Sequence, residues 1–123
     1  ATLRMARGIA TATQHLHARG ILHGDLYAHN ILHTPQGDAL LSDFGAAAFF
    51  DVHDATLAQG LENIEVRALG CLLEELAMQC DAHGADTHAH QTLTQLAQQC
   101  LHDLPAMRPR LAQLCAKLEA LDT

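Results

Sequence analysis

The chain has little of what marks nucleic-acid-binding and membrane proteins. Its 123 residues include a single lysine (Lys117), no tryptophan and 3% aromatic residues, and the net charge is −7 with histidine neutral. An acidic chain lacks the basic surface that meets nucleic acid or an anionic membrane. No apolar run reaches the ~18 residues of a membrane span, and no signal-peptide pattern is present. We therefore expect a cytoplasmic protein with neither nucleic-acid nor membrane partners.

The cysteines show no C-x-x-C pair. All four fall on apolar faces of helical patterns, at Cys71, Cys80, Cys100 and Cys115. Reduced, buried cysteines are typical of cytosolic proteins, and we expect that here. The segment "CDAHGADTHAH" holds residue types that suit zinc: Cys80, His83, His88 and His90. Their spacing matches no standard finger or ribbon, so a solvated loop is favoured.

Abundant alanine and leucine, in a chain that is 49% hydrophobic, favour helix. The apolar spacing predicts helices over residues 2–19, 63–80, 87–103 and 110–121. The expected inward residues of the first helix are Met5, Ile9, Ala12 and Leu16, and those of the second are Val66, Leu69, Leu72, Leu73, Leu76 and Cys80. The sequence thus predicts one mainly α domain.

One short hairpin is expected in this helical chain. Residues 31–33 and 39–42 flank "TPQGD", a turn built on Pro35 and Gly37. Residues 46–60 show no clear period and are expected to be irregular.

Three polar residues stand out, because the hairpin between them folds the chain back and is expected to bring them to one face. Asp25 and Asn30 share the loop "HGDLYAHNIL", and Asp43 follows the hairpin in "LSDFG". Carboxylate and amide oxygens suit Mg²⁺, and a second carboxylate can orient a hydroxyl and accept its proton. Each residue alone is more often a turn former or a cap. Together, at these spacings, they indicate phosphoryl transfer.

These motifs resemble the protein kinase family, and specifically its larger C-terminal lobe. The stretch "HGDLYAHN" is similar to the catalytic loop His-Arg-Asp-Leu-x-x-x-Asn, and "LSDFG" is similar to the magnesium-binding Asp-Phe-Gly. The stretch "VRALGCLLEEL" resembles the central helix of that lobe, and "CLHDLPAMRPRLAQL" its closing Arg-Pro segment and last helix. The resemblance spans essentially the whole chain, so we expect residues 1–123 to form a kinase-like C-terminal lobe with its hairpin beside the catalytic loop.

The resemblance implies a role for each matching residue. Asp25 would be the catalytic aspartate, and Asn30 and Asp43 would hold Mg²⁺. Leu32 would pack under the adenine of ATP, which Asp43 also helps to bind. The implied reaction is transfer of the γ-phosphoryl group of MgATP to a hydroxyl of a protein substrate, of the serine/threonine type.

Other matching residues are implied to be structural. His23 would pack against Phe44, next to Gly45 of the Asp-Phe-Gly motif, and brace the catalytic loop. Glu65 stands where the family usually has aspartate, and would accept backbone N–H bonds from the catalytic loop. Arg108 belongs to the closing Arg-Pro segment.

The loop departs from the family pattern at two positions. Gly24 replaces the arginine that receives an activation-loop phosphate in regulated kinases, so we expect no regulation of that kind. Tyr27 replaces the lysine that reaches the transferred phosphoryl group, and a phenol supplies no cationic charge at neutral pH.

Two pieces of peptide-binding surface are missing from the pattern. Glu65 comes only 22 positions after Asp43, and the stretch between them holds no Ala-Pro-Glu motif. Arg108 usually pairs with that motif's glutamate, so Glu62 or Glu65 is its expected partner here. "DAHGAD" leaves no room for the extra helix that helps to dock protein substrates.

The motifs of an N-terminal lobe are also missing. No G-x-G-x-x-G is present, and Lys117 lies too late in the chain to pair with the nucleotide. We expect that lobe upstream in the same protein. Two alternatives stay open: a pseudokinase that serves as an interaction module, and a small-molecule phosphotransferase of the aminoglycoside or choline type, in which "HGD" is the commoner form.

Overall fold

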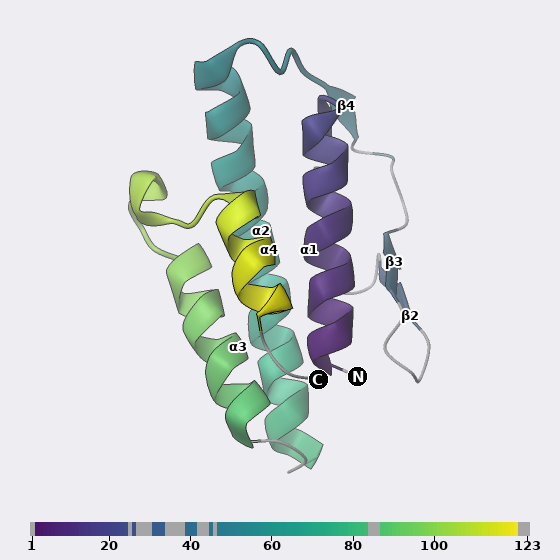
Figure 1. Cartoon of the computed structure of the whole chain (residues 1–123), viewed down its shortest axis with the longest axis vertical. Coiled ribbons are helices and arrows are strands. Elements are labelled where there is room, and N and C mark those ends of the chain that lie inside the picture. Colours follow the sequence, from purple (N-terminus) through teal and green to yellow (C-terminus); the bar gives the residue numbers. More distant parts are fainter. Residues whose placement is uncertain are drawn as a thin grey trace.

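The computed structural model describes residues 2–24, 26, 31–33, 39–41, 45, 47–83 and 87–120. The α-helices of this part are α1 (Thr2–Ala18), α2 (Ala55–His83), α3 (Thr87–Cys100) and α4 (Leu111–Glu119), with a 3-10 turn, η3 (Pro105–Met107), before the last of them. Figure 1 shows α2 running the length of the molecule, with α3 along one side, α1 along the other and α4 crossing in front. The mainly helical fold is confirmed. None of the described helices combines the length and the apolar character that a bilayer span requires.

Two small antiparallel sheets lie beside α1 (Figure 1). The predicted hairpin is confirmed, since β2 (Ile31–His33) pairs with β3 (Ala39–Leu41). A second pairing, of β1 (Ile21–Leu22) with β4 (Ala48–Phe49), was not predicted. Strands of two residues are too short to show an alternating pattern in the sequence.

The core forms between one face of α2 and the other three helices. Its fully buried members include Val66 and Leu69 of α2, Leu93 of α3 and Leu114 of α4. The predicted inward residues of α2 are buried wherever the structure describes them. The predicted stripe of α1 is wrong by about one position, because Met5, Ala12 and Leu16 are only partly buried. The buried face of α1 instead carries Leu3, Ala6, Ile9, Ala10, Thr13 and His17.

The start of α2 corrects the sequence-based boundary. Residues 46–60 were expected to be irregular, yet α2 begins at Ala55, eight residues before the predicted start. Asp54 caps it, since the Oδ1 atom accepts the backbone N–H of Leu57 at 3.1 Å. The first two turns of the helix are largely exposed, so no buried stripe marks them in the sequence.

The described cysteines Cys71, Cys100 and Cys115 are free thiols. Burial raises the pKa of the Cys100 thiol to about 12, and burial also raises the pKa of Cys115. Both thiols therefore stay protonated and poorly nucleophilic at neutral pH.

Candidate active site

The segments that flank the candidate catalytic residues are held together by the two sheets. Asp25, Asn30, Asp43 and Phe44 lie outside the described residues, as do Tyr27 and the side chain of Leu32. β1 ends three residues before Asp25, and its partner β4 begins five residues after Asp43. β2 begins directly after Asn30, and its partner β3 ends two residues before Asp43. The chain on either side of these residues is therefore paired strand to strand.

Two glycines with positive φ flank β1, at the start of the candidate catalytic loop. After α1 the chain turns at Gly20, whose φ is +73°, into β1, and Gly24 has a φ of +84°. Both values lie in the left-handed region that glycine adopts without strain. At Gly24, as at Gly20, this backbone conformation favours glycine over a residue with a Cβ.

A buried carboxylate from α2 holds the backbone at this point. Oε1 of Glu65 accepts the N–H of His23 at 2.9 Å, and Oε2 accepts the N–H of Gly24 at 3.3 Å. The Glu65 side chain is only 2% exposed. These are the bonds that the sequence assigned to Glu65. They fix the two residues directly before Asp25 to α2.

His17, near the end of α1, is a partner of Glu65 that sequence reasoning missed. Its Nε2 lies 3.0 Å from Glu65 Oε1, and both side chains are buried. An ionised carboxylate can only accept, so His17 then donates from Nε2. A buried carboxylate is costly unless its oxygens are hydrogen-bonded. The available signal was position: Ile9, Thr13 and His17 recur every four residues along the buried face of α1.

His17 also contacts the chain that follows Asp43. Its ring meets the ring of Phe50 edge to face, with centroids 5.5 Å apart. The N–H of Phe50 donates to Gly20 O at 2.8 Å. A Cβ at Gly20 would lie 2.5 Å from Phe50 O, so the two segments approach too closely for any other residue. The cluster of His17, Glu65, His23 and Phe50 therefore joins α1, α2 and both sides of the candidate site.

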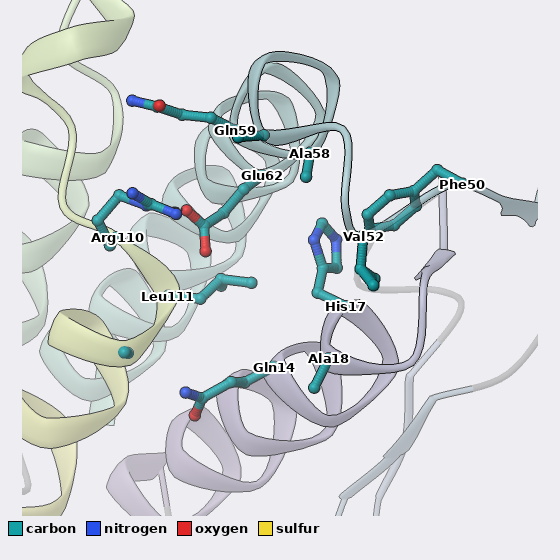
Figure 2. Close-up of a pocket in the computed structure, with 12 residues that line it drawn as sticks. Gln14, His17, Ala18, Phe50, Val52, Ala58, Gln59, Glu62, Arg110 and Leu111 are labelled. Atoms are coloured by element: carbon teal, nitrogen blue, oxygen red, sulfur yellow. Dashed lines mark hydrogen bonds and ion pairs between the residues drawn. The ribbon is translucent and has the colours of Figure 1, made fainter.

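A cavity of about 420 Å³ opens beside this cluster. Figure 2 shows His17, Phe50 and Val52 along one wall and Leu111 opposite them. An ion pair between Glu62 and Arg110 closes the side formed by α2 and the start of α4. Its wall thus mixes apolar and charged groups from three helices.

Comparison with known families decides what this arrangement belongs to. The family described as "Protein tyrosine and serine/threonine kinase" matches residues 1–80. The chain belongs to the protein kinase family.

Individual kinases match over shorter stretches. Serine/threonine-protein kinase AtPK1/AtPK6 of Arabidopsis thaliana is 46% identical over 43 residues, which cover 35% of this chain and 9% of that protein. CBL-interacting protein kinase 22 of Oryza sativa subsp. japonica is 39% identical over 51 residues, covering 42% of this chain and 11% of that protein. The matched region is thus about a tenth of the length of these curated relatives.

A solved kinase structure shares the fold over nearly the whole chain. It is a divergent kinase lacking the glycine-rich loop, which "regulates membrane ultrastructure of the Toxoplasma parasitophorous vacuole". The TM-score is 0.78 at 20% identity, and the match covers 98% of this chain and 43% of that one. At this identity the likeness establishes the kinase fold.

Arg108 of this kinase lobe does not bind either carboxylate that was expected to replace the missing motif. Its Nε donates to His102 O at 2.9 Å and its Nη1 donates to Asn63 O at 3.1 Å. Glu62 pairs instead with Arg110, and Glu65 with His17. The prediction of a Glu62 or Glu65 partner was wrong because both acids are engaged by nearer cations or donors.

Of the four residues considered as zinc ligands, the structure describes the side chains of His88 and His90. The side chains of Cys80 and His83 are not described. Nδ1 of His90 lies 2.7 Å from Ala77 O, so that nitrogen is hydrogen-bonded to the backbone of α2. Among the side chains that are described, no group of three metal-binding types comes together.

Proposed function

We propose that this chain is the catalytic lobe of a serine/threonine-type protein kinase, which transfers the γ-phosphoryl group of ATP to a protein hydroxyl. The observation that carries the proposal is the Glu65 anchor. A carboxylate that is 2% exposed accepts the N–H groups of His23 and Gly24. A general base must be positioned within hydrogen-bond reach of its proton. An anchored backbone immediately before Asp25 supports that requirement.

The residues divide the work between chemistry and support. Asp25 would accept the proton of the substrate hydroxyl, and the oxygen donors of Asn30 and Asp43 would hold Mg²⁺. The ion would supply positive charge to offset the phosphate charge during transfer. Leu32 packs under the adenine. Glu65 and His17 hold the loop, and Gly45 follows the metal-binding motif.

ATP is covered by an N-terminal lobe upstream in the same protein, and the acceptor is a hydroxyl on a protein. No activation-loop phosphate is needed, because Gly24 leaves no cation to receive one. The proposed compartment is the cytoplasm.

The test is phosphate transfer by the chain expressed with its preceding segment. Asp25→Asn removes the base while keeping the size of the side chain, and we expect a loss of about a thousandfold in kcat. Asp54→Asn is the matched control, since Asp54 is exposed and asparagine also caps helices. Chelation of Mg²⁺ should abolish phosphate transfer by the wild type and by the Asp54→Asn control. An Asp25→Asn variant with full activity would refute the proposed base.

An interaction module without transfer activity is the second candidate. The early start of α2 favours it, because the helix occupies chain from Ala55 onward that standard kinases use for peptide docking. Nucleotide titration separates the two candidates: an inactive protein that binds a folded partner but no MgATP would support the module. Transfer to a free amino sugar or to choline, with none to protein, would instead indicate a small-molecule phosphotransferase.

A further inference from the structure

The outer face of α2 carries an apolar stripe that nothing in the catalytic proposal uses. We call this stripe the outer seam, and its members are Leu57, Leu61, Ile64, Ala68, Cys71, Glu75 and Met78. Steps of four and three residues alternate along it without interruption. This 3.5-residue spacing is that of the contact seam between two helices of a coiled coil. Six of its seven members are apolar or thiol side chains.

Four members of the outer seam are exposed in the described chain, whereas Leu61, Ala68 and Cys71 are partly buried and Ala68 also packs against the core. Ile64 is 63% exposed, Met78 65% and Leu57 45%. Core residues such as Leu69 and Leu73 point the other way, toward α1, α3 and α4. Contiguous apolar patches on a protein surface mark interaction sites.

The loop before α4 extends this surface beside Ile64. Arg108 fastens the loop to α2 through the carbonyl of Asn63. The neighbouring Leu104 and Met107 are 61% and 62% exposed. Apolar surface therefore continues from α2 onto η3.

Two unengaged charges of opposite sign flank the outer seam. Arg67 and Glu74 are exposed, lie seven residues apart on one side of it, and make no hydrogen bond or ion pair with another described residue. Two copies of α2 packed antiparallel, with the two-fold axis between Leu69 and Gly70, bring Arg67 of each copy against Glu74 of the other. Charges flanking such a seam set the partner and the orientation.

The same register also matches the seam residues by size. It sets Leu61 opposite Met78, and the small Ala68 and Cys71 opposite each other at the crossing, where the helices approach most closely. Glu75 falls opposite Ile64, and a single polar residue in a seam helps to specify one register.

Other registers bring like charges together. Sliding one copy by seven residues sets either Arg67 against Arg67 or Glu74 against Glu74. In a parallel pairing, Arg67 of one copy would face position 72 of the other. Leu72 is buried in the core and offers no charge to pair with. Repulsion in the alternatives is how a surface selects one arrangement.

From the spacing, the exposure and the charges we propose that the chain forms a two-fold symmetric dimer, in which the outer seams of two α2 helices pack antiparallel. The occupant of this face is a second copy of the chain. Such an isologous contact uses the same patch twice. It leaves the inner face of α2, and with it Glu65, unchanged.

A charge swap tests both the partner and the register. Sedimentation equilibrium of the full chain in reducing buffer should give a dimer with a Kd near or below ~10 µM, the range of modest specific interfaces. Arg67→Glu and Glu74→Arg, each alone, should weaken the dimer at least about tenfold, since each creates two like-charge contacts. The double variant R67E/E74R should restore it. Lys117→Glu is the matched control, because it makes the same charge change on α4, whose Leu114 packs against the inner side.

Each other outcome overturns the proposal. A wild-type chain that sediments as a monomer at about 100 µM lacks the dimer. A dimer that either single reversal leaves intact, or that the double variant does not restore, uses another surface or register. Circular dichroism of every variant should match the wild type, since all the altered side chains are exposed. The readout is mass, so it stands apart from any measurement of phosphoryl transfer.

Discussion

The two faces of α2 show how differently one helix can be used. On the inner face Val66, Leu69 and Leu73 are at most 3% exposed, whereas on the outer face Ile64 and Met78 exceed 60%. Hydrophobic residues occur on both faces, so composition does not decide which is buried. What differs is the neighbour: α1, α3 and α4 gather on one side only. The inner face stabilises the fold and anchors the candidate site, and the outer face carries the exposed apolar side chains.

The largest expected effect comes from removing one apolar side chain from the inner face. Leu69→Ala should lower the free energy of unfolding by about 3 kcal/mol, because it leaves a cavity among packed helices. Ile64→Ala, the matched change on the outer face, should cost less than about 0.5 kcal/mol. Urea unfolding at low protein concentration measures both. Similar losses for the two variants would contradict the contrast between the faces.

The next effect concerns the polar group on the inner face. Glu65→Gln keeps one acceptor oxygen but loses the other, so one of the N–H groups of His23 and Gly24 loses its partner; we expect a cost of about 2 kcal/mol. Glu75→Gln, exposed on the same helix, should cost almost nothing. Thermal unfolding compares them. If Glu65→Gln were as stable as the control, the buried hydrogen bonds would contribute no stability.

Two glycines allow the faces to be compared with one substitution. A Cβ at Gly70 would lie 2.8 Å from the Cβ of Cys100 and 3.0 Å from Leu101 Cγ, whereas a Cβ at Gly60 meets nothing within 4 Å. Gly70→Ala should therefore destabilise by about 1.5 kcal/mol through overpacking. Gly60→Ala should stabilise by about 0.5–1 kcal/mol through helix propensity. Equal signs in chemical denaturation would show that α3 can shift to make room.

The smallest effect is a pH dependence from Cys100, which packs against Gly70. Burial raises its pKa from 9.0 to about 12. The folded state then keeps a proton that the unfolded chain loses, so stability from this group is constant below pH 9 and falls as the pH rises toward 12. The loss reaches about 1.4 kcal/mol at pH 10. Unfolding at pH 8 and pH 10 measures it, and Cys100→Ala should flatten the dependence; an unchanged slope would exclude the thiol as its source.

Much of the helical fold could be predicted because the apolar residues of its helices recur with a clear period. The inward residues of α2 followed from their spacing, and the hairpin of β2 and β3 followed from its turn residues. The first turns of α2 escaped prediction because they are exposed. The sheet of β1 and β4 escaped prediction because a pairing of two residues across 25 others leaves no local signal in the sequence.

The candidate site was predicted through motifs rather than through periodicity. The anchoring bonds of Glu65 were expected from the family pattern. His17 was not expected, because a histidine at the end of a helix resembles an exposed polar residue unless the whole buried face of α1 is traced. Arg108 was expected to pair with Glu62 or Glu65, because the family's arginine usually pairs with a glutamate. That pairing does not form, since Glu62 pairs with Arg110 and Glu65 with His17. The places of Asp25, Asn30 and Asp43 remain predictions.

The pairing of β1 with β4 has a consequence for how this lobe opens. It closes the chain from His23 to Ala47 into a single loop whose two ends are fastened at one point, by the strand pair and the Phe50 bond to Gly20. Isolated two-stranded pairs are only marginally stable, so we expect the pairing of β1 with β4 to open locally before the helices unfold. The amides of Leu22, Phe49 and Phe50 should then exchange with solvent as one cooperative unit. A shared exchange rate, faster than that of the α2 amides, would show that this small sheet controls local opening of the catalytic region.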